Sequence, residues 1–318
     1  HDGFQFRFIN YASLPPNTQV PSIRGNGDHW NIDLVYLDSS RTITDTILDD
    51  AAFSKPIKSF LKNYESIPWK HFTSQAMLAE LTNPLSFNIQ YRYLGEVTDS
   101  VNVNRAFVVS DLSTPNNHYI IAKDAENIGS FQTIDFSKGY EYTFLSNWTD
   151  SAKYRMESYM ELESTSPAPY LNWNDTVRYT QQFFNYYAYD DGSAEGGYGW
   201  WGEGSQNAMV ALKYHAYVDD SLKGILIYFN TIVDYFGSKD FDLMVWSNSN
   251  GKPGTVLYQE TVKKPKLTYD TDTLYKINAK LKLGSDFWIG TKNSTEDMLN
   301  IGFDLNNNHN DMLYYNLT

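Results

Sequence analysis

The stretch Gly25-Asn-Gly-Asp-His-Trp-Asn-Ile-Asp-Leu-Val-Tyr-Leu-Asp38 joins a turn to a strand and indicates the fold class. Glycine, asparagine and aspartate are typical of turns between β-strands. Apolar residues then recur at every second position, as in a strand with one buried face: Trp30, Ile32, Leu34 and Tyr36. An earlier run has the same period: Phe4, Phe6 and Phe8. Two strands cannot form a stable domain, so either later strands complete this sheet or the sequence begins part-way through a larger protein. The second alternative is the one we predict, with residues 1–43 as the C-terminal part of a truncated β-sandwich.

The composition excludes several functional classes. The chain has 318 residues, of which 42% are hydrophobic and 16% aromatic, enough for two or three domains with buried cores. Its net charge is −13, and basic residues are scattered along the sequence, so nucleic-acid binding is not expected. There is no cysteine, which excludes disulfides, thiolate metal sites and cysteine nucleophiles. No apolar run is long enough to span a membrane, so direct membrane insertion is not expected.

Residues 44–82 differ from the flanking sequence because their apolar residues follow a helical spacing. These residues are Ala51, Phe53, Ile57, Phe60, Leu61 and Tyr64. Pro56 and Pro68 mark breaks in the pattern. We therefore expect a partly helical connector in this region.

A second β-sandwich, of fibronectin or immunoglobulin size, is predicted over residues 83–165. Its candidate strands are Phe87–Tyr93, Ala106–Val109, Tyr119–Ala122, Tyr140–Leu145 and Tyr154–Leu162. The small, proline-rich segment Ser164–Pro169 has no apolar period and predicts a domain boundary.

Residues 170–318 predict a jelly-roll-like sandwich, because short strands follow one another with turns between them. The candidate strands are Thr176–Ala188, Ala208–Tyr217, Leu222–Asn230, Phe241–Ser247, Thr255–Thr261, Thr273–Leu281 and Asp286–Thr291. The segment Asn248–Gly254 predicts a hairpin turn between two of them. Met312–Leu317 is a strand pattern at the end of the sequence, so this sandwich is expected to be one strand short. The predicted fold class is thus mainly β, with tandem antiparallel sandwiches and a short helical connector.

Six segments, taken in order, resemble surface and secreted proteins that Bacteroidota export through the type IX secretion system. They are Phe4–Tyr11, Gly25–Leu37, Pro56–Phe72, Tyr189–Tyr198, Leu222–Asn230 and Phe241–Gly254. The resemblance implies an extracytoplasmic protein, at the cell surface or secreted, that is either cargo of the pathway or held at the outer-membrane export machinery. Proteins of this group continue, beyond the position of Thr318, into one more strand and a sorting domain.

The resemblance also implies O-glycosylation, which Bacteroidota place at Asp-Ser or Asp-Thr followed by a small or apolar residue. Six residues stand in such tripeptides: Thr46, Ser100, Ser151, Thr176, Ser221 and Thr273. These tripeptides also arise by chance in a chain rich in aspartate and threonine.

Two acidic segments are candidates for calcium, the one cofactor that the sequence suggests. Asp190, Asp191 and Glu195 stand among glycines and would supply the oxygen ligands that Ca²⁺ prefers. The alternative is a solvated acidic turn that leads into a strand. A weaker candidate is formed by Asp28, Asp33 and Asp38 near Asn26. The polar run Asn306–Asp311 resembles a binding loop, but its residues also suit turns with positive φ.

Exposed aromatic residues would suggest a carbohydrate-binding surface, because flat rings stack on sugar faces. The best candidates are Tyr198, Trp200 and Trp201, which stand among glycines. The alternative is that these rings fill the edge of a sandwich core.

No catalytic motif is apparent, and we expect no enzyme activity. The histidines stand in unrelated contexts, namely His71 in the connector, His118 and His309 in predicted loops, and His215 on a predicted strand. There is no zinc-protease motif, nucleophile elbow, phosphate loop or dinucleotide fingerprint.

The sequence therefore predicts a non-enzymatic extracytoplasmic binding protein of a type IX pathway, with protein partners at the outer membrane. Two alternatives stay open. The first is a lectin-like adhesin that binds polysaccharide, and the second is an accessory region of a secreted hydrolase.

Overall fold

The structure is a computed structural model of the chain. It describes residues 7–9, 22–25, 32, 35, 42–44, 47–97, 100–114, 118–163, 174–230, 239–265 and 272–317. These residues are mainly β, in antiparallel sheets with one short helical segment, as the sequence predicts. The chain forms two compact units: unit 1 comprises His1–Tyr36 and Asp190–Thr318, and unit 2 comprises Leu37–Tyr189.

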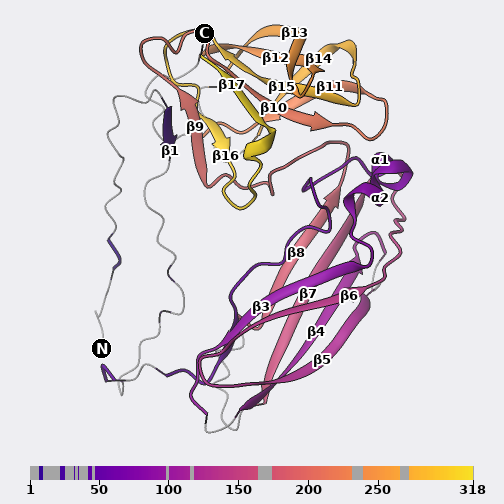
Figure 1. Cartoon of the computed structure of the whole chain (residues 1–318), viewed down its shortest axis with the longest axis vertical. Helices are drawn as coiled ribbons and strands as arrows, with labels where there is room; N and C mark the ends of the chain where they lie inside the picture. Colours follow the sequence, from indigo (N-terminus) through magenta and orange to yellow (C-terminus); the bar gives the residue numbers. More distant parts are fainter. Residues whose placement is uncertain are drawn as a thin grey trace. The chain divides into compact units, whose positions relative to one another are not determined.

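Unit 2 contains two sheets (Figure 1). The first has the strand order β2 (Ala51–Phe53), β3 (Leu85–Tyr93) and β6 (Thr133–Tyr140). The second has the order β5 (His118–Ile128), β4 (Val101–Asp111), β7 (Ala152–Glu163) and β8 (Thr176–Phe183). Every second residue of β3 is buried, and Phe87 of β3 stacks on Phe107 of β4 with 3.6 Å between the ring centroids. The core of unit 2 thus lies between its two sheets.

A tyrosine near the start of β7 forms a hydrogen bond with the connection between β6 and β7. The hydroxyl of Tyr154 donates a hydrogen bond to the backbone carbonyl of Leu145, in the connection between β6 and β7. Such a tyrosine corner, together with two antiparallel sheets of this size, is typical of immunoglobulin-like sandwiches. The predicted strand Tyr140–Leu145 is therefore wrong beyond Tyr140. These residues instead form the corner, where Phe144 packs edge-on against Tyr154.

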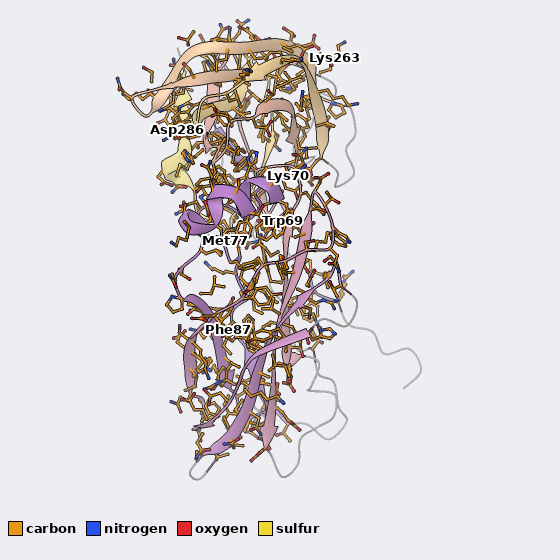
Figure 2. The ribbon with its side chains drawn as sticks, turned by 90° about the vertical axis from the view of Figure 1, so that its right-hand side faces the viewer. Trp69, Lys70, Met77, Phe87, Lys263 and Asp286 are labelled. Atoms are coloured by element: carbon orange, nitrogen blue, oxygen red, sulfur yellow. The ribbon has the colours of Figure 1, made fainter. Side chains whose placement is uncertain are left out.

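The connector is helical, but not where the apolar spacing places the helix. Its helical part comprises α1 (Trp69–His71), a π-helix (Phe72–Ala76) and α2 (Met77–Glu80), which begin directly after Pro68. Figure 2 labels Trp69, Lys70 and Met77 on this segment. Earlier residues form β2 and irregular backbone. Ile57, Phe60 and Leu61 are buried in unit 2, so their spacing reflects tertiary packing instead of a helix.

Unit 1 contains a sheet of five strands. Their order is β13 (Lys252–Lys263), β12 (Asp240–Ser249), β15 (Asp286–Asn293), β10 (Met209–His215) and β17 (Leu313–Asn316), with a 3₁₀ turn at Asn310–Met312 before β17. β11 (Ser221–Ile227) pairs with β14 (Thr273–Lys282). A third sheet has the order β1 (Ser22–Gly25), β9 (Gly196–Trp200) and β16 (Ile301–Phe303).

The core of unit 1 lies between the five-stranded sheet and the β11–β14 pair. Ile225 and Ile227 of β11 pack in one buried cluster with Phe241 and Leu243 of β12. The predicted hairpin joins β12 to β13: Asn250 and Gly251 have φ of 52° and 78°, and the flanking Ser249 and Lys252 are paired. Positive φ at both central residues is the geometry that Asn-Gly adopts in tight hairpins.

The unit boundaries differ from those predicted. β8 pairs with β7, so the strands before and after the proline-rich segment 164–169 belong to one sheet of unit 2. β1 pairs with β9, which places the N-terminal strand in the same unit as the C-terminal sandwich. The predicted strands around Phe4–Phe8 and Trp30–Tyr36 lie largely outside the described residues, and their few described members are not in strands.

Candidate functional site

Two loops of unit 1 meet at one end of the β9–β16 pair. Gly196 begins β9, Phe303 ends β16, and the two residues are paired. The loop before β9 and the loop after β16 therefore lie side by side. We call residues 190–195 and 304–308 the acidic loop pair. It unites two segments, around Asp191 and Asn306, that the sequence pattern treats separately.

Hydrogen bonds join the two loops directly. The Asp191 carboxylate accepts hydrogen bonds from the Ser193 hydroxyl at 2.6 Å and from Asn306 Nδ2 at 3.0 Å. Glu195 accepts from the same Asn306 amide at 3.2 Å and from the backbone N–H of Leu305 at 3.0 Å. Asp304, which the sequence pattern did not single out, accepts from the backbone N–H of Asp191 at 3.2 Å. Asn306 thus bridges two carboxylates.

These contacts set the charge of the loop pair. Burial would raise the pKa of Asp191, but hydrogen bonds from Ser193 and Asn306 outweigh it and lower that pKa. In Glu195, burial is likewise outweighed by hydrogen bonds from Ser193 and Leu305, and its pKa is lowered. Burial is the main cause of the raised pKa values of Asp190 and Asp304. Asp191 and Glu195 therefore carry the most persistent negative charge.

The geometry of the loop pair bears on the calcium hypothesis. The oxygens of Asp191 and Glu195 already accept hydrogen bonds, and Asp190 accepts one from the N–H of Gly192 at 3.2 Å. Within the described part of the chain, no group of three or more histidine, aspartate or glutamate side chains is arranged to hold a metal ion. Calcium binding here stays a prediction. Asp28, Asp33 and Asp38 lie outside the described residues.

The three candidate sugar-binding aromatics do not form one exposed surface. Trp200 is only 7% exposed, and its ring contacts those of Tyr198 and Tyr315, with 5.5 and 5.6 Å between centroids. Trp201 follows the end of β9 and is 40% exposed. Of the three, only Trp201 thus offers an accessible indole to a ligand.

The loop that follows Trp201 is held by backbone hydrogen bonds. Gly202 and Gly204 have φ of 87° and 85°, a conformation that favours glycine. Their N–H groups donate to the carbonyl and to the side chain of Glu296, at 2.8 and 3.1 Å. This anchors the backbone directly next to the exposed indole.

The candidate glycosylation residues lie at the ends of strands. Ser100 is exposed and precedes β4, while the other described candidates are half-buried: Ser151, Thr176, Ser221 and Thr273. Thr46 lies outside the described residues.

Three histidines have separate partners. His71 lies 2.8 Å from the Tyr187 hydroxyl, His118 lies 2.7 Å from the Ser110 hydroxyl, and His215 lies 2.7 Å from Asp286. They come from different elements, and none of these contacts links one histidine to another.

Exposed apolar side chains on strands are a feature that the sequence did not reveal. Tyr119 and Ile120 are exposed on β5, which is the edge strand of its sheet among the described residues. Leu226 of β11 and Leu274 of β14 are also exposed, and they are direct cross-strand partners. Contiguous exposed apolar groups and apolar edge strands are typical of interaction surfaces.

No helix among the described residues is long and apolar enough to cross a membrane. Comparison of the chain with models of known protein families, with curated proteins and with solved structures finds no match.

Proposed function

We propose that this chain is a non-enzymatic extracytoplasmic binding protein of a type IX secretion pathway. It acts through contacts with protein partners at the outer membrane, either as cargo or as a component held at the export machinery. The pathway and the location derive from the resemblance of segments such as Tyr189–Tyr198 and Phe241–Gly254.

One observation carries the binding role. Both units expose apolar side chains on strands: Tyr119 and Ile120 in unit 2, and the Leu226–Leu274 pair in unit 1. Edge strands with free backbone groups accept a further strand from a partner, and exposed apolar side chains add affinity to that pairing.

The test is affinity purification of the native protein from gently solubilised cell envelopes, with mass spectrometry of the proteins that co-purify. Stoichiometric recovery of outer-membrane export proteins is the expected result. A protein with the charge of the exposed residue Glu141 reversed serves as the control, and it should recover the same partner proteins as the native protein does. Elution of the protein alone would contradict the proposal.

A lectin-like function is the second candidate, and the exposed indole of Trp201 favours it. A glycan array, read with the parent protein and with Trp201→Ala, tests this role. Sugar binding that the substitution abolishes would establish it, whereas Trp200→Phe should have no effect because Trp200 is buried.

A further inference from the structure

The outer face of the β11–β14 pair differs in charge from the rest of the chain. The chain has a net charge of −13, yet neither strand contains aspartate or glutamate. The two strands carry four exposed lysines: Lys223, Lys276, Lys280 and Lys282. Within the described part of the chain, these lysines form no ion pair. We call this surface the lysine face.

The strand period explains why Lys276, Lys280 and Lys282 of β14 share one face. Ile225 and Ile227 of β11 and Ile277 of β14 point into the core of unit 1. Successive side chains of a strand point to opposite faces, so their neighbours point outward. Two of these neighbours are Leu226 and Leu274, which are cross-strand partners and are 50% and 53% exposed. The lysine face therefore combines positive charge with an exposed apolar pair.

The backbone of β14 is also open to a partner. Among the described residues, β14 has ten residues and pairs only with β11, with a register shift between Leu222 and Gly224, so its other side forms no strand pairing there. Lysines on an edge strand usually discourage pairing with other chains, and this structural role is the simpler explanation. The lysines discourage pairing only with neutral or basic strands, because an acidic strand would be attracted by the same positive charges.

The dimensions and charge of this face favour a narrow partner. Two neighbouring strands lie about 4.8 Å apart, so the lysine face is only roughly 10 Å wide. Charges repel one another within about a Debye length, which is about 8 Å at physiological salt. A broad anionic surface bound to the lysine face would therefore be repelled by the surrounding protein, because the chain as a whole is acidic. A single extended acidic chain fits the face without that repulsion.

The residues beside the free edge indicate what such a chain would contain. A strand added to β14 would place alternate side chains next to Lys276, Lys280 and Lys282 on the outside. The intervening side chains would extend the core next to half-buried Tyr275 and buried Ile277. Acidic residues suit the first set of positions and apolar residues the second.

The geometry points to the free edge of β14 as a docking site for an extended segment of a partner protein in which acidic and apolar residues alternate. Its carboxylates pair with the lysines, its apolar side chains extend the core of unit 1, and its backbone pairs with β14. This inference rests on the proposed function, because it names the surface and the chemistry through which the partner binds.

The first experiment measures binding of a fluorescent peptide with five Glu-Val repeats to the full chain by anisotropy, at low and high salt. The variant Lys276→Gln/Lys280→Gln/Lys282→Gln removes three exposed ion pairs with the peptide. The lost binding free energy should weaken the affinity about tenfold. The control Lys58→Gln/Lys62→Gln/Lys123→Gln removes the same charge from exposed positions of unit 2 and should leave the affinity within about twofold.

A second measurement needs no protein variant. A peptide with Lys-Val repeats should not bind, and methylation of alternate backbone amides of the Glu-Val peptide should abolish binding because it blocks strand pairing. Equal weakening in the control variant, or undiminished binding of the methylated peptide, would overturn the inference. Tighter binding of a sulfated polysaccharide or of anionic vesicles, or dimerisation of the chain through this edge, would also overturn it.

The two proposals can fail separately. If the Lys276/Lys280/Lys282 variant recovers the envelope partners as well as the parent does, the docking site is wrong and the binding role stands. If neither protein recovers partners, the proposed function fails, and peptide binding still decides whether the edge accepts an acidic strand.

Discussion

Gln181 of β8 accepts a hydrogen bond from the hydroxyl of Ser59 at 2.6 Å, although 122 positions separate the two residues. Gln181 is fully buried. Its amide oxygen also accepts from the N–H of Phe60 at 3.2 Å, and its Nε2 donates to the carbonyl of Glu65 at 2.6 Å. One side chain thus forms hydrogen bonds with two backbone groups of the irregular segment between Phe60 and Glu65.

Gln181→Leu should therefore destabilise unit 2. The substitution leaves the buried N–H of Phe60 and the carbonyl of Glu65 without their partner, which costs about 1–3 kcal/mol per unsatisfied group. Chemical denaturation, followed by hydrogen exchange of unit 2, measures the change. Gln182→Leu on the same strand is the control, and equal stability of the two variants would contradict the prediction.

The tyrosine corner provides a milder test. Tyr154→Phe removes the hydroxyl that donates to Leu145 but keeps the ring among its aromatic neighbours. A loss of about 1 kcal/mol in the free energy of unfolding is expected. Tyr159→Phe on the same strand, where the ring is partly exposed, should change the free energy by less than half of that.

The stability of unit 2 should fall as pH rises from about 4 to about 6. Burial, with the charges of Asp50 and Glu161 nearby, raises the pKa of Asp175 from 3.8 to about 6. The native state then binds more protons than the unfolded state in this window, so the free energy of unfolding falls with rising pH.

Asp175→Asn should remove this loss. Because Asp175 is partly solvated, we expect a gain of only about 1 kcal/mol at pH 7.5, and none at pH 4. Calorimetry at both pH values measures it, with Glu141→Gln as an exposed control of equal charge change. An equal gain at both pH values would show that charge on Asp175 is not the cause.

Calcium provides a test of the acidic loop pair. Since Asn306 already bridges Asp191 and Glu195, these loops should be ordered without a metal ion. Addition of about 1 mM Ca²⁺, a concentration in the affinity range of extracellular calcium sites, should then shift Tm by less than about 1 °C. A larger rise that Glu195→Gln abolishes would instead establish the calcium site.

The sequence predicted the fold well where local signals agree with packing. The β12–β13 hairpin was predicted because Asn250 and Gly251 suit its turn and apolar residues flank it. β9 escaped prediction because its glycines suggest a loop. They are required by close approach: a Cβ on Gly197 would lie 2.2 Å from Asn300 Oδ1, and one on Gly199 would lie 2.3 Å from the Leu299 carbonyl.

The candidate sites depend on contacts between distant parts of the chain. Asp191 and Asn306 are 115 positions apart, and only the pairing of β9 with β16 brings them together. The lysines of β11 and β14 look scattered in the sequence for the same reason. Their gathering on one face follows from strand pairing and could not be read from composition.

The pairing of β1 with β9 has a consequence for how the chain reaches its native state. Ser22 pairs with Trp200, so the whole of unit 2 is an insertion between two strands of unit 1. During synthesis from the N-terminus, β1 is made first, but β9 is made only after the whole of unit 2. Since domains generally fold as units, unit 2 is expected to fold before β1 can pair with β9. The late step is then the pairing of β1 with β9, which follows the folding of the insert.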